Sequence, residues 1–163
     1  MPVLSDADIA RRLKDGTLRI EGYDDGNLTP NGYDVTIEEI LVPSIGAKKR
    51  SGVVSIPGNS WFIIGTKEFF AFPSNLMGQI WIRTTWVRKG ILSSFGIIDA
   101  GFNGNLTFSA YNASKEPVDV PIGERFAQVI FEELASPPTK NYAERSGNYQ
   151  GQRGITLKPT RKS

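Results

Sequence analysis

The chain of 163 residues contains no cysteine and no histidine. Without cysteine there is no disulfide, no thiol nucleophile and no cysteine-ligated metal. Without histidine there is no Ser-His-Asp triad, no HExxH metalloprotease site and no His/Cys/Cys zinc site. Catalysis near neutral pH must therefore use a carboxylate, a lysine, a tyrosine or a metal ion that arrives with the substrate.

A strong net charge and a long apolar run are also missing. The formal charge of +2 is small and spread along the chain, which does not favour a nucleic-acid partner. No apolar stretch approaches the length of a membrane-spanning helix, and the N-terminus lacks the apolar segment of a signal peptide. We therefore expect a soluble, cytoplasmic protein with neither nucleic acid nor membrane as its partner.

What the sequence does contain is a series of short strand-like segments separated by its 17 glycines and 10 prolines. These segments are residues 34–37, 53–56, 60–64, 69–72, 77–83, 106–112 and 126–131. Many short strands in one domain predict a mainly β fold, which is a sandwich, a jelly roll or a barrel. A short N-terminal helix is expected first, with Ser5 and Asp8 as a capping box and Gly16 as its stop.

The segment around Asp99 is the centre of the chain's organisation. Asp99 ends an apolar stretch, and the turn that follows contains Gly101 and Gly104. Taken alone, this pattern favours a plain hairpin with an aspartate in its turn. Phe102, three positions after the acid, is either an ordinary core residue or a platform for a sugar or a base.

A basic segment, residues 83–90, directly follows an apolar strand. Its two arginines, one lysine and two threonines could form a cradle for a polyphosphate, because guanidinium groups offer forked donors to phosphate oxygens. A solvated basic turn explains the same residues equally well.

After Pro137 and Pro138 the composition changes. Residues 142–154 are rich in Gly, Asn, Gln, Arg and Tyr and offer little to a core. They are either a frayed tail or a lid that closes over a ligand. We therefore divide the chain into a β domain, residues 1–138, and a C-terminal lid with a basic tail, residues 139–163.

Five motifs in order resemble the dCTP deaminase/dUTPase superfamily, and most of all the archaeal-type dUTPases of the deaminase-like branch. They are Asn31-Gly32-Tyr33-Asp34, Arg83-Thr84-Thr85 with Arg88, Ile98-Asp99-Ala100-Gly101-Phe102-Asn103-Gly104, Gly123-Glu124-Arg125-Phe126-Ala127-Gln128-Val129-Ile130 and Tyr149-Gln150-Gly151-Gln152-Arg153-Gly154. The resemblance covers nearly the whole chain.

The resemblance implies a distorted jelly-roll β-barrel that assembles as a homotrimer, or as a hexamer of two trimers, with active sites between subunits. It implies that Mg²⁺ is the cofactor and that the substrate's phosphates carry it, with no direct protein ligand. Tyr149 and Gln152 would belong to the closing lid.

It also implies roles around the central turn. Asp99 would orient and activate the hydrolytic water. Phe102 would lie under the deoxyribose and help to reject a ribose. Backbone groups of residues 93–98, including Ile98, would read the pyrimidine edge.

The phosphate-binding residues would come from other segments of the chain. By the same resemblance, Arg83, Thr84 and Thr85 would hold phosphates. Arg88 would lie near the phosphates or the base, and Gln128 near the phosphates or the water.

One departure from the family pattern decides between its two activities. The deaminases carry a glutamate on the strand after the turn, and it moves protons at the pyrimidine C4. That position here is Ser109, which cannot accept a proton from water at neutral pH. Glu116 and Asp119 lie beyond the strand.

The sequence therefore predicts a Mg²⁺-dependent dUTP diphosphatase that forms dUMP and pyrophosphate and so limits uracil in DNA. A dCTP deaminase, monofunctional or bifunctional, is the first alternative. A catalytically silent nucleotide-binding protein is the second.

Overall fold

The computed structural model describes residues 2–160. Its helical elements are α1 (Asp6–Lys14), the 3₁₀ turns η1 (Asp25–Asn27) and η2 (Pro43–Ile45), and the single-turn α2 (Thr84–Val87). Its strands are β1 (Arg19–Glu21), β2 (Leu28–Thr29), β3 (Gly32–Val42), β4 (Ala47–Lys49), β5 (Val53–Ile56), β6 (Ser60–Ala71), β7 (Leu76–Ile82), β8 (Ile91–Ser93), β9 (Ile97–Ile98), β10 (Asn103–Asn112), β11 (Val118–Pro121) and β12 (Arg125–Glu133).

Helix α1 begins and ends as the sequence predicts. The Ser5 hydroxyl accepts a hydrogen bond from the Asp8 backbone N–H at 3.2 Å, and the Asp8 carboxylate accepts one from the Ser5 N–H at 3.3 Å. Gly16 follows the helix with a φ of 77°, a conformation that glycine adopts without strain. Ile9 is fully buried, so the helix docks its apolar side on the sheet.

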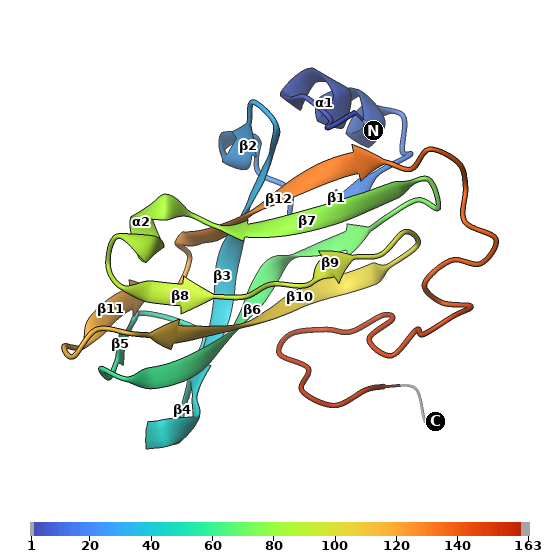
Figure 1. Ribbon diagram of the computed structural model, residues 1–163. Coiled ribbons are helices and arrows are strands. Elements are labelled where there is room, and N and C mark those ends of the chain that lie inside the picture. The colour runs from blue at the N-terminus through green and yellow to red at the C-terminus, as the bar shows by residue number, and fades with distance from the viewer. Residues whose placement is uncertain (1, 161–163) are drawn as a thin grey trace.

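Ten of the strands form one curled antiparallel sheet, and β5 and β11 pair with each other in a separate two-stranded sheet. Along the larger sheet the order is β8-β10-β6-β3-β12-β7-β9, and β1, β2 and β4 pair at its sides (Figure 1). The two end strands, β8 and β9, are neighbours in the sequence and are joined by residues 94–96 alone. The sheet must therefore curl until its two edges approach each other, which confirms the expected barrel-like, mainly β fold.

Two details of this sheet differ from the sequence-based expectation. Residues 60–64 and 69–72 were expected as two strands, but residues 60–71 form the single long strand β6. The Asp99 segment is not a hairpin, since β9 pairs with β7 whereas β10 pairs with β6 and β8. Strand pairing is a tertiary property, so alternation and turn residues indicate a strand without revealing its partner.

Aromatic side chains fill the space inside the curl. Phe70, Phe72 and Phe131 form one cluster, with ring centroids 5.5–6.4 Å apart. Phe126 contacts both Phe62 and Trp86 in a second cluster. Within the described residues, no helix is long and apolar enough to span a membrane.

Glu68 on β6 is a carboxylate that the core buries completely. One oxygen accepts the Thr36 backbone N–H at 2.9 Å, and in the described part of the chain Oε1 has no hydrogen-bond partner. Burial raises the pKa of Glu68 above its ordinary value of 4.5, and the hydrogen bond from Thr36 offsets this only in part.

A raised pKa means that the folded state binds the proton more tightly than the unfolded state. The contribution of Glu68 is therefore favourable at low pH and is lost as the pH rises through its folded pKa. We expect the unfolding free energy of the wild type, relative to Glu68→Gln, to fall as the pH rises from 4.5 through the raised pKa of Glu68 in the folded state. The fall is about 1.4 kcal/mol for each pH unit between the unfolded and folded pKa values. Denaturant titrations at several pH values measure this difference, and Glu116→Gln, at an exposed position, is the control. An unfolding free energy that changes with pH in the same way in wild type and Glu68→Gln would contradict the expectation.

Candidate active site

The turn after β9 presents Asp99. The Asp99 carbonyl oxygen accepts the Phe102 N–H at 3.1 Å, and Gly101 has a φ of 84° at the third position of this turn. The Gly101 N–H donates to the Pro73 carbonyl at 3.2 Å, so the turn is fixed to the loop after β6. The Asp99 side chain is exposed, and within residues 2–160 its carboxylate accepts no hydrogen bond. The carboxylate is therefore held on a rigid turn and remains available to a ligand.

A cavity of about 440 Å³ opens beside this turn, between β9 and β10. Its lining comes from the β8–β9 connection, the Asp99 turn, β10 and the C-terminal segment. The lining residues are Ile80, Ser94, Phe95, Gly96, Ile97, Ile98, Asp99, Phe102, Leu106, Thr107, Phe108, Ser109, Tyr142, Tyr149, Gln152 and Thr156. The volume is that of a site for a small organic molecule.

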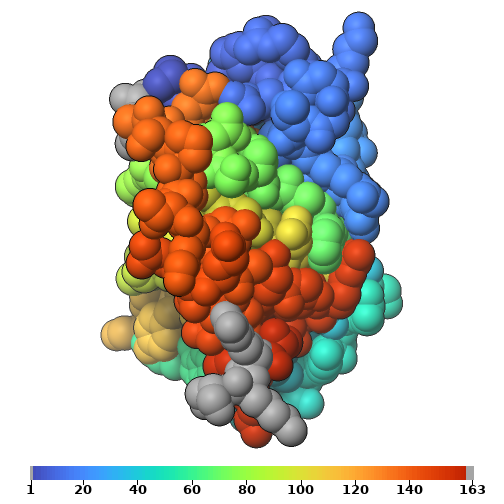
Figure 2. All heavy atoms as spheres, turned by 90° about the vertical axis from the view of Figure 1, so that its right-hand side faces the viewer, coloured from blue at the N-terminus to red at the C-terminus, as the bar shows by residue number. Residues whose placement is uncertain are grey.

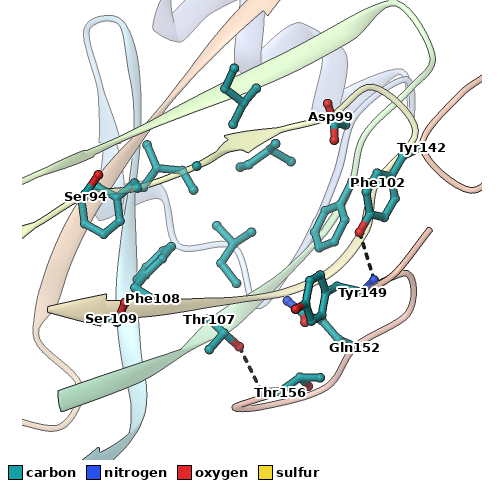
Figure 3. A pocket seen from close by; sticks show the side chains of 16 residues that line it. Ser94, Asp99, Phe102, Thr107, Phe108, Ser109, Tyr142, Tyr149, Gln152 and Thr156 are labelled. Atoms are coloured by element: carbon teal, nitrogen blue, oxygen red, sulfur yellow. Dashed lines mark hydrogen bonds between the residues drawn. The ribbon is translucent and has the colours of Figure 1, made fainter. Parts of the chain in front are cut away.

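The two ends of the cavity differ in character (Figure 3). Asp99 lies near one end with Phe102, Tyr142 and Tyr149, and the other end holds Ser94 with the Phe95–Phe108 pair. Phe95 and Phe108 meet edge to face with centroids 5.0 Å apart. The second end is therefore suited to a flat apolar ring with polar edges, and the first to a polar or charged group.

The C-terminal segment covers one side of the cavity. The Tyr142 hydroxyl accepts the Tyr149 N–H at 2.9 Å, and its ring meets Phe102 edge to face at 5.5 Å. Gln152 is 7% exposed, and its Nε2 donates to the Asn105 carbonyl. In Figure 2 the segment, coloured orange to red, runs down this face of the molecule.

The frayed-tail alternative is therefore wrong for these residues. They were expected to contribute little to packing because they are polar, but backbone and amide hydrogen bonds give them a fixed path. The end of the expected basic tail, residues 161–163, lies outside the described residues.

Asp99 is the single carboxylate among the cavity-lining residues, and the lining has neither Lys nor Arg. Ser109 lies at the other end, exposed, with its carbonyl accepting the Ser93 hydroxyl at 2.7 Å. The described residues contain no cluster of three acidic groups that could enclose a metal. A lining with one carboxylate fits a magnesium ion that phosphate oxygens and water would hold, because Mg²⁺ is commonly bound through substrate phosphates and keeps several waters.

The structure brings together five of the predicted site residues. Asp99, Ile98, Phe102, Tyr149 and Gln152 all line the cavity. Their roles remain predictions, because no bound ligand tests them.

The basic segment lies elsewhere on the same chain. Ile98 pairs with Gly78 on β7, and Arg83 lies five residues further along that direction, a strand distance of about 17 Å. Thr84 and Thr85 lie in α2, and Arg88 ends it; all three are exposed. None of these four residues is among those that line the Asp99 cavity.

Arg83 has a partner of its own. Its Nε lies 3.0 Å from the Asp34 carboxylate, and Arg125 lies 3.5 Å from the same oxygen. Burial raises the pKa of Asp34, and the two arginines act against that rise. The Asp34 side chain is buried and that of Arg83 is only partly exposed, so their ion pair fixes Arg83 at the end of β7.

Gln128 also lies away from the cavity. It lies on β12 opposite Asp34 and Trp81, and its Nε2 donates to the Thr29 hydroxyl at 2.6 Å. Gln128 is not among the lining residues, and its place near the phosphates or the water stays a prediction.

Sequence reasoning missed several lining residues. Tyr142, Thr107 and Thr156 received no individual role, although all three line the cavity. An aromatic residue in an otherwise polar segment was a usable signal for Tyr142. The others lie on a strand or at the chain's end, where nothing in the sequence distinguishes a lining residue from an ordinary one.

Comparison with known proteins gives the following relatives. Residues 50–157 match a family model described as dUTPase. A protein of Pyrococcus horikoshii named dCTP deaminase is 39% identical over 145 residues, which are 88% of this chain and 91% of the relative. A protein of Sulfolobus islandicus rod-shaped virus 1, named a probable deoxyuridine 5′-triphosphate nucleotidohydrolase, is 32% identical over 157 residues, covering 95% of this chain and 97% of that one.

A solved structure shares the fold. The 2′-deoxycytidine 5′-triphosphate deaminase from Agrobacterium tumefaciens superposes with a TM-score of 0.68 at 18% identity, over 81% of this chain. The matched region is 48% of that deaminase chain, so this chain spans about half its length.

Proposed function

This chain belongs to the dCTP deaminase/dUTPase superfamily, and we propose that it hydrolyses dUTP to dUMP and pyrophosphate. The observation that carries the proposal is the composition of the cavity. It contains one carboxylate, Asp99, and where a deaminating enzyme needs a second proton carrier it contains Ser109. Hydrolysis at phosphorus needs one general base, whereas replacing an amine on a pyrimidine needs a group that takes a proton from water and passes it to the leaving nitrogen.

In the proposed reaction Asp99 accepts a proton from water as the water oxygen bonds to the α-phosphorus. The bond from this phosphorus to the bridging oxygen breaks, and pyrophosphate leaves with the electron pair. The pyrimidine lies at the Phe95–Phe108 end of the cavity, and the deoxyribose lies against Phe102. Magnesium, bound to the triphosphate as part of the substrate, neutralises charge that develops on the phosphate oxygens.

The triphosphate needs cations that the cavity of one chain lacks, and we assign them to a second copy of the chain. Arg83 and Arg88 lie at the far end of β7, and a neighbouring subunit can bring them to the Asp99 cavity. Three exposed apolar side chains support the proposal of an assembly. Trp61, Tyr111 and Leu92 face one another across β6, β10 and β8, and they are 48%, 41% and 53% exposed. A homotrimer, or a hexamer of two trimers, is the proposed state.

Mixing two inactive variants tests this assembly. Asp99→Asn and Arg88→Ala are each expected to lose most dUTP hydrolysis. If each site combines Asp99 of one subunit with Arg88 of another, oligomers formed from equal amounts of both variants regain about a quarter of the wild-type rate by random assortment. The rate after co-expression, with light scattering for the mass, measures this; mixed oligomers without recovery would place the whole site in one chain.

The activity itself is tested by supplying dUTP and dCTP in parallel with Mg²⁺. Nucleotides are separated by ion exchange, and pyrophosphate and ammonia are measured. We expect dUMP and pyrophosphate from dUTP and no change in dCTP. Tight binding of dUTP without pyrophosphate would instead indicate a silent nucleotide-binding protein.

A dCTP deaminase is the second candidate, and the names of two relatives favour it. The Arg83-Thr84-Thr85 segment, with Arg88 after it, fits that activity as well as the first. Release of ammonia from dCTP would establish deamination and would show that proton transfer proceeds without a carboxylate at position 109.

A further inference from the structure

Glu39 on β3 is a buried carboxylate that the proposed reaction does not use. It is 2% exposed, although it lies beside Ile40 of the apolar core. Side chains alternate across a strand, so Glu39 faces away from the side on which Ile40 packs. The pairing of β3 with β6 shifts in register between Ile37 and Glu39, so the side-chain alternation up to Ile37 does not continue regularly to Glu39.

The C-terminal segment covers this carboxylate and binds it. The Ile155 backbone N–H donates to Glu39 Oε1 at 2.5 Å, and Lys48 on β4 lies 3.3 Å from Oε2. Lys48 is largely exposed, so the charge of Glu39 is balanced from the solvent side and its hydrogen bond comes from the tail.

Two glycines make room for the carboxylate. Gly65, opposite Glu39 in the sheet register, would place a Cβ 3.0 Å from Glu39 Cγ and 3.0 Å from Ile155 Cγ1. Gly154 has a φ of 61°, and a Cβ there would lie 2.6 Å from Glu39 Oε1. Strand β3, strand β6 and the tail are thus shaped around one carboxylate, as in a built binding site.

This contact adjoins residues that line the cavity. Thr156 follows Ile155, and its N–H donates to the Thr107 hydroxyl at 3.1 Å. Gln152 precedes Ile155 by three residues and Tyr149 by six, and both face the cavity (Figure 3). A fixed Ile155 therefore restricts where Tyr149 and Gln152 can lie.

We propose that Glu39 is a positioning residue that holds the C-terminal segment over the cavity by binding the Ile155 amide, and so sets the affinity for the nucleotide. The affinity part of this inference rests on the proposed function. The holding of the segment does not, because it is measured without substrate.

Glu39→Ala is expected to raise KM for dUTP by about tenfold or more, because a hydrogen bond to a charged group is lost, and to change kcat much less. Glu39→Gln keeps an acceptor for the Ile155 N–H and is expected to restore most of the affinity. Glu38→Ala is the matched control. It removes the same charge from a neighbouring carboxylate, which pairs with Arg50 at 2.9 Å.

A second pair of variants acts from the tail. Gly154→Ala places a methyl group against the Glu39 carboxylate, whereas Gly151→Ala has a similar φ of 74° and nothing within 4 Å of the added carbon. Because the two glycines have similar φ values, the comparison isolates the contact with Glu39. Gly154→Ala should therefore raise KM more than Gly151→Ala does.

Amide hydrogen exchange of residues 149–156, without nucleotide, is the measurement that is independent of activity. We expect faster exchange in Glu39→Ala and Gly154→Ala than in Glu38→Ala, Gly151→Ala and wild type. Exchange and KM in Glu39→Ala equal to those of Glu38→Ala would overturn the proposal. A wild type that does not hydrolyse dUTP would end the proposed function alone, because the exchange comparison still decides whether Glu39 holds the tail.

Discussion

Asp99→Asn is expected to lower kcat for dUTP hydrolysis by about 10²- to 10⁴-fold, the usual contribution of a general base. Asparagine has nearly the same shape but cannot accept the proton of the attacking water. The turn should survive, since it depends on the Asp99 carbonyl, the Phe102 N–H and the φ of Gly101, and all three are unchanged. Steady-state kinetics with pyrophosphate detection and a separate measurement of dUTP binding test the two halves of this expectation.

Asp119→Asn is the matched control, because it removes the same charge from an exposed position on β11. Its kcat should equal that of the wild type. If Asp99→Asn also keeps a near-normal kcat, Asp99 is not the base. If it loses dUTP binding together with activity, the carboxylate acts in binding rather than in proton transfer.

Removal of residues 139–163 is expected to lower kcat/KM for dUTP by about 10²-fold or more and to reduce stability by a few kcal/mol. The sequence indicated a segment that offers little to the core, so its loss was expected to leave the fold intact. The structure adds a stability cost, because Glu39 and Asn105 both lose hydrogen-bond partners when the tail is removed. Buried polar groups left without partners cost about 1–3 kcal/mol each.

Truncation after Thr160 is the control, since it keeps every tail contact described above. Thermal unfolding and dUTP kinetics of the two truncated forms are to be compared with the full chain. If the longer truncation does not fold, Tyr149→Ala in the full chain separates the loss of a cavity residue from the loss of the tail. A form ending at Pro138 with full activity and full stability would show that the tail is only an appendage.

The local structure was largely predictable from the sequence. The capping box of Ser5 and Asp8, the stop at Gly16 and the alternation along residues 107–112 depend on neighbours close in the chain. Residues 60–71 show where this reasoning ends. Gly65 and Thr66 were left outside the two expected strands, but they lie inside one strand, where Gly65 makes room for Glu39 and the Thr66 hydroxyl accepts the Leu106 N–H.

The candidate site was predictable in part for the same reason. Asp99, Ile98 and Phe102 lie within five residues of one another, so a motif contains their arrangement. Tyr149 and Gln152 were assigned to the lid through the resemblance. They line the cavity because the tail runs beside it. Glu39 carried no signal at all, because its partner Ile155 is 116 residues away in the chain.

By itself, the sequence determined which chemistry is open to this protein. The absence of His and Cys leaves a carboxylate, a lysine, a tyrosine or a substrate-borne metal ion for proton transfer, and by the family resemblance Ser109 takes the place of a deaminase glutamate. Residue identities settle these points because they concern what a side chain can do at a given pH. Only the tertiary structure decided which groups meet. The sheet curls until its edges meet at residues 94–96, and the cavity opens there beside Asp99. Arg83 lies at the other end of β7, and the polar tail packs over buried Glu39. Strand pairing and tail docking join residues far apart in the sequence, and the packing of the whole chain selects those contacts.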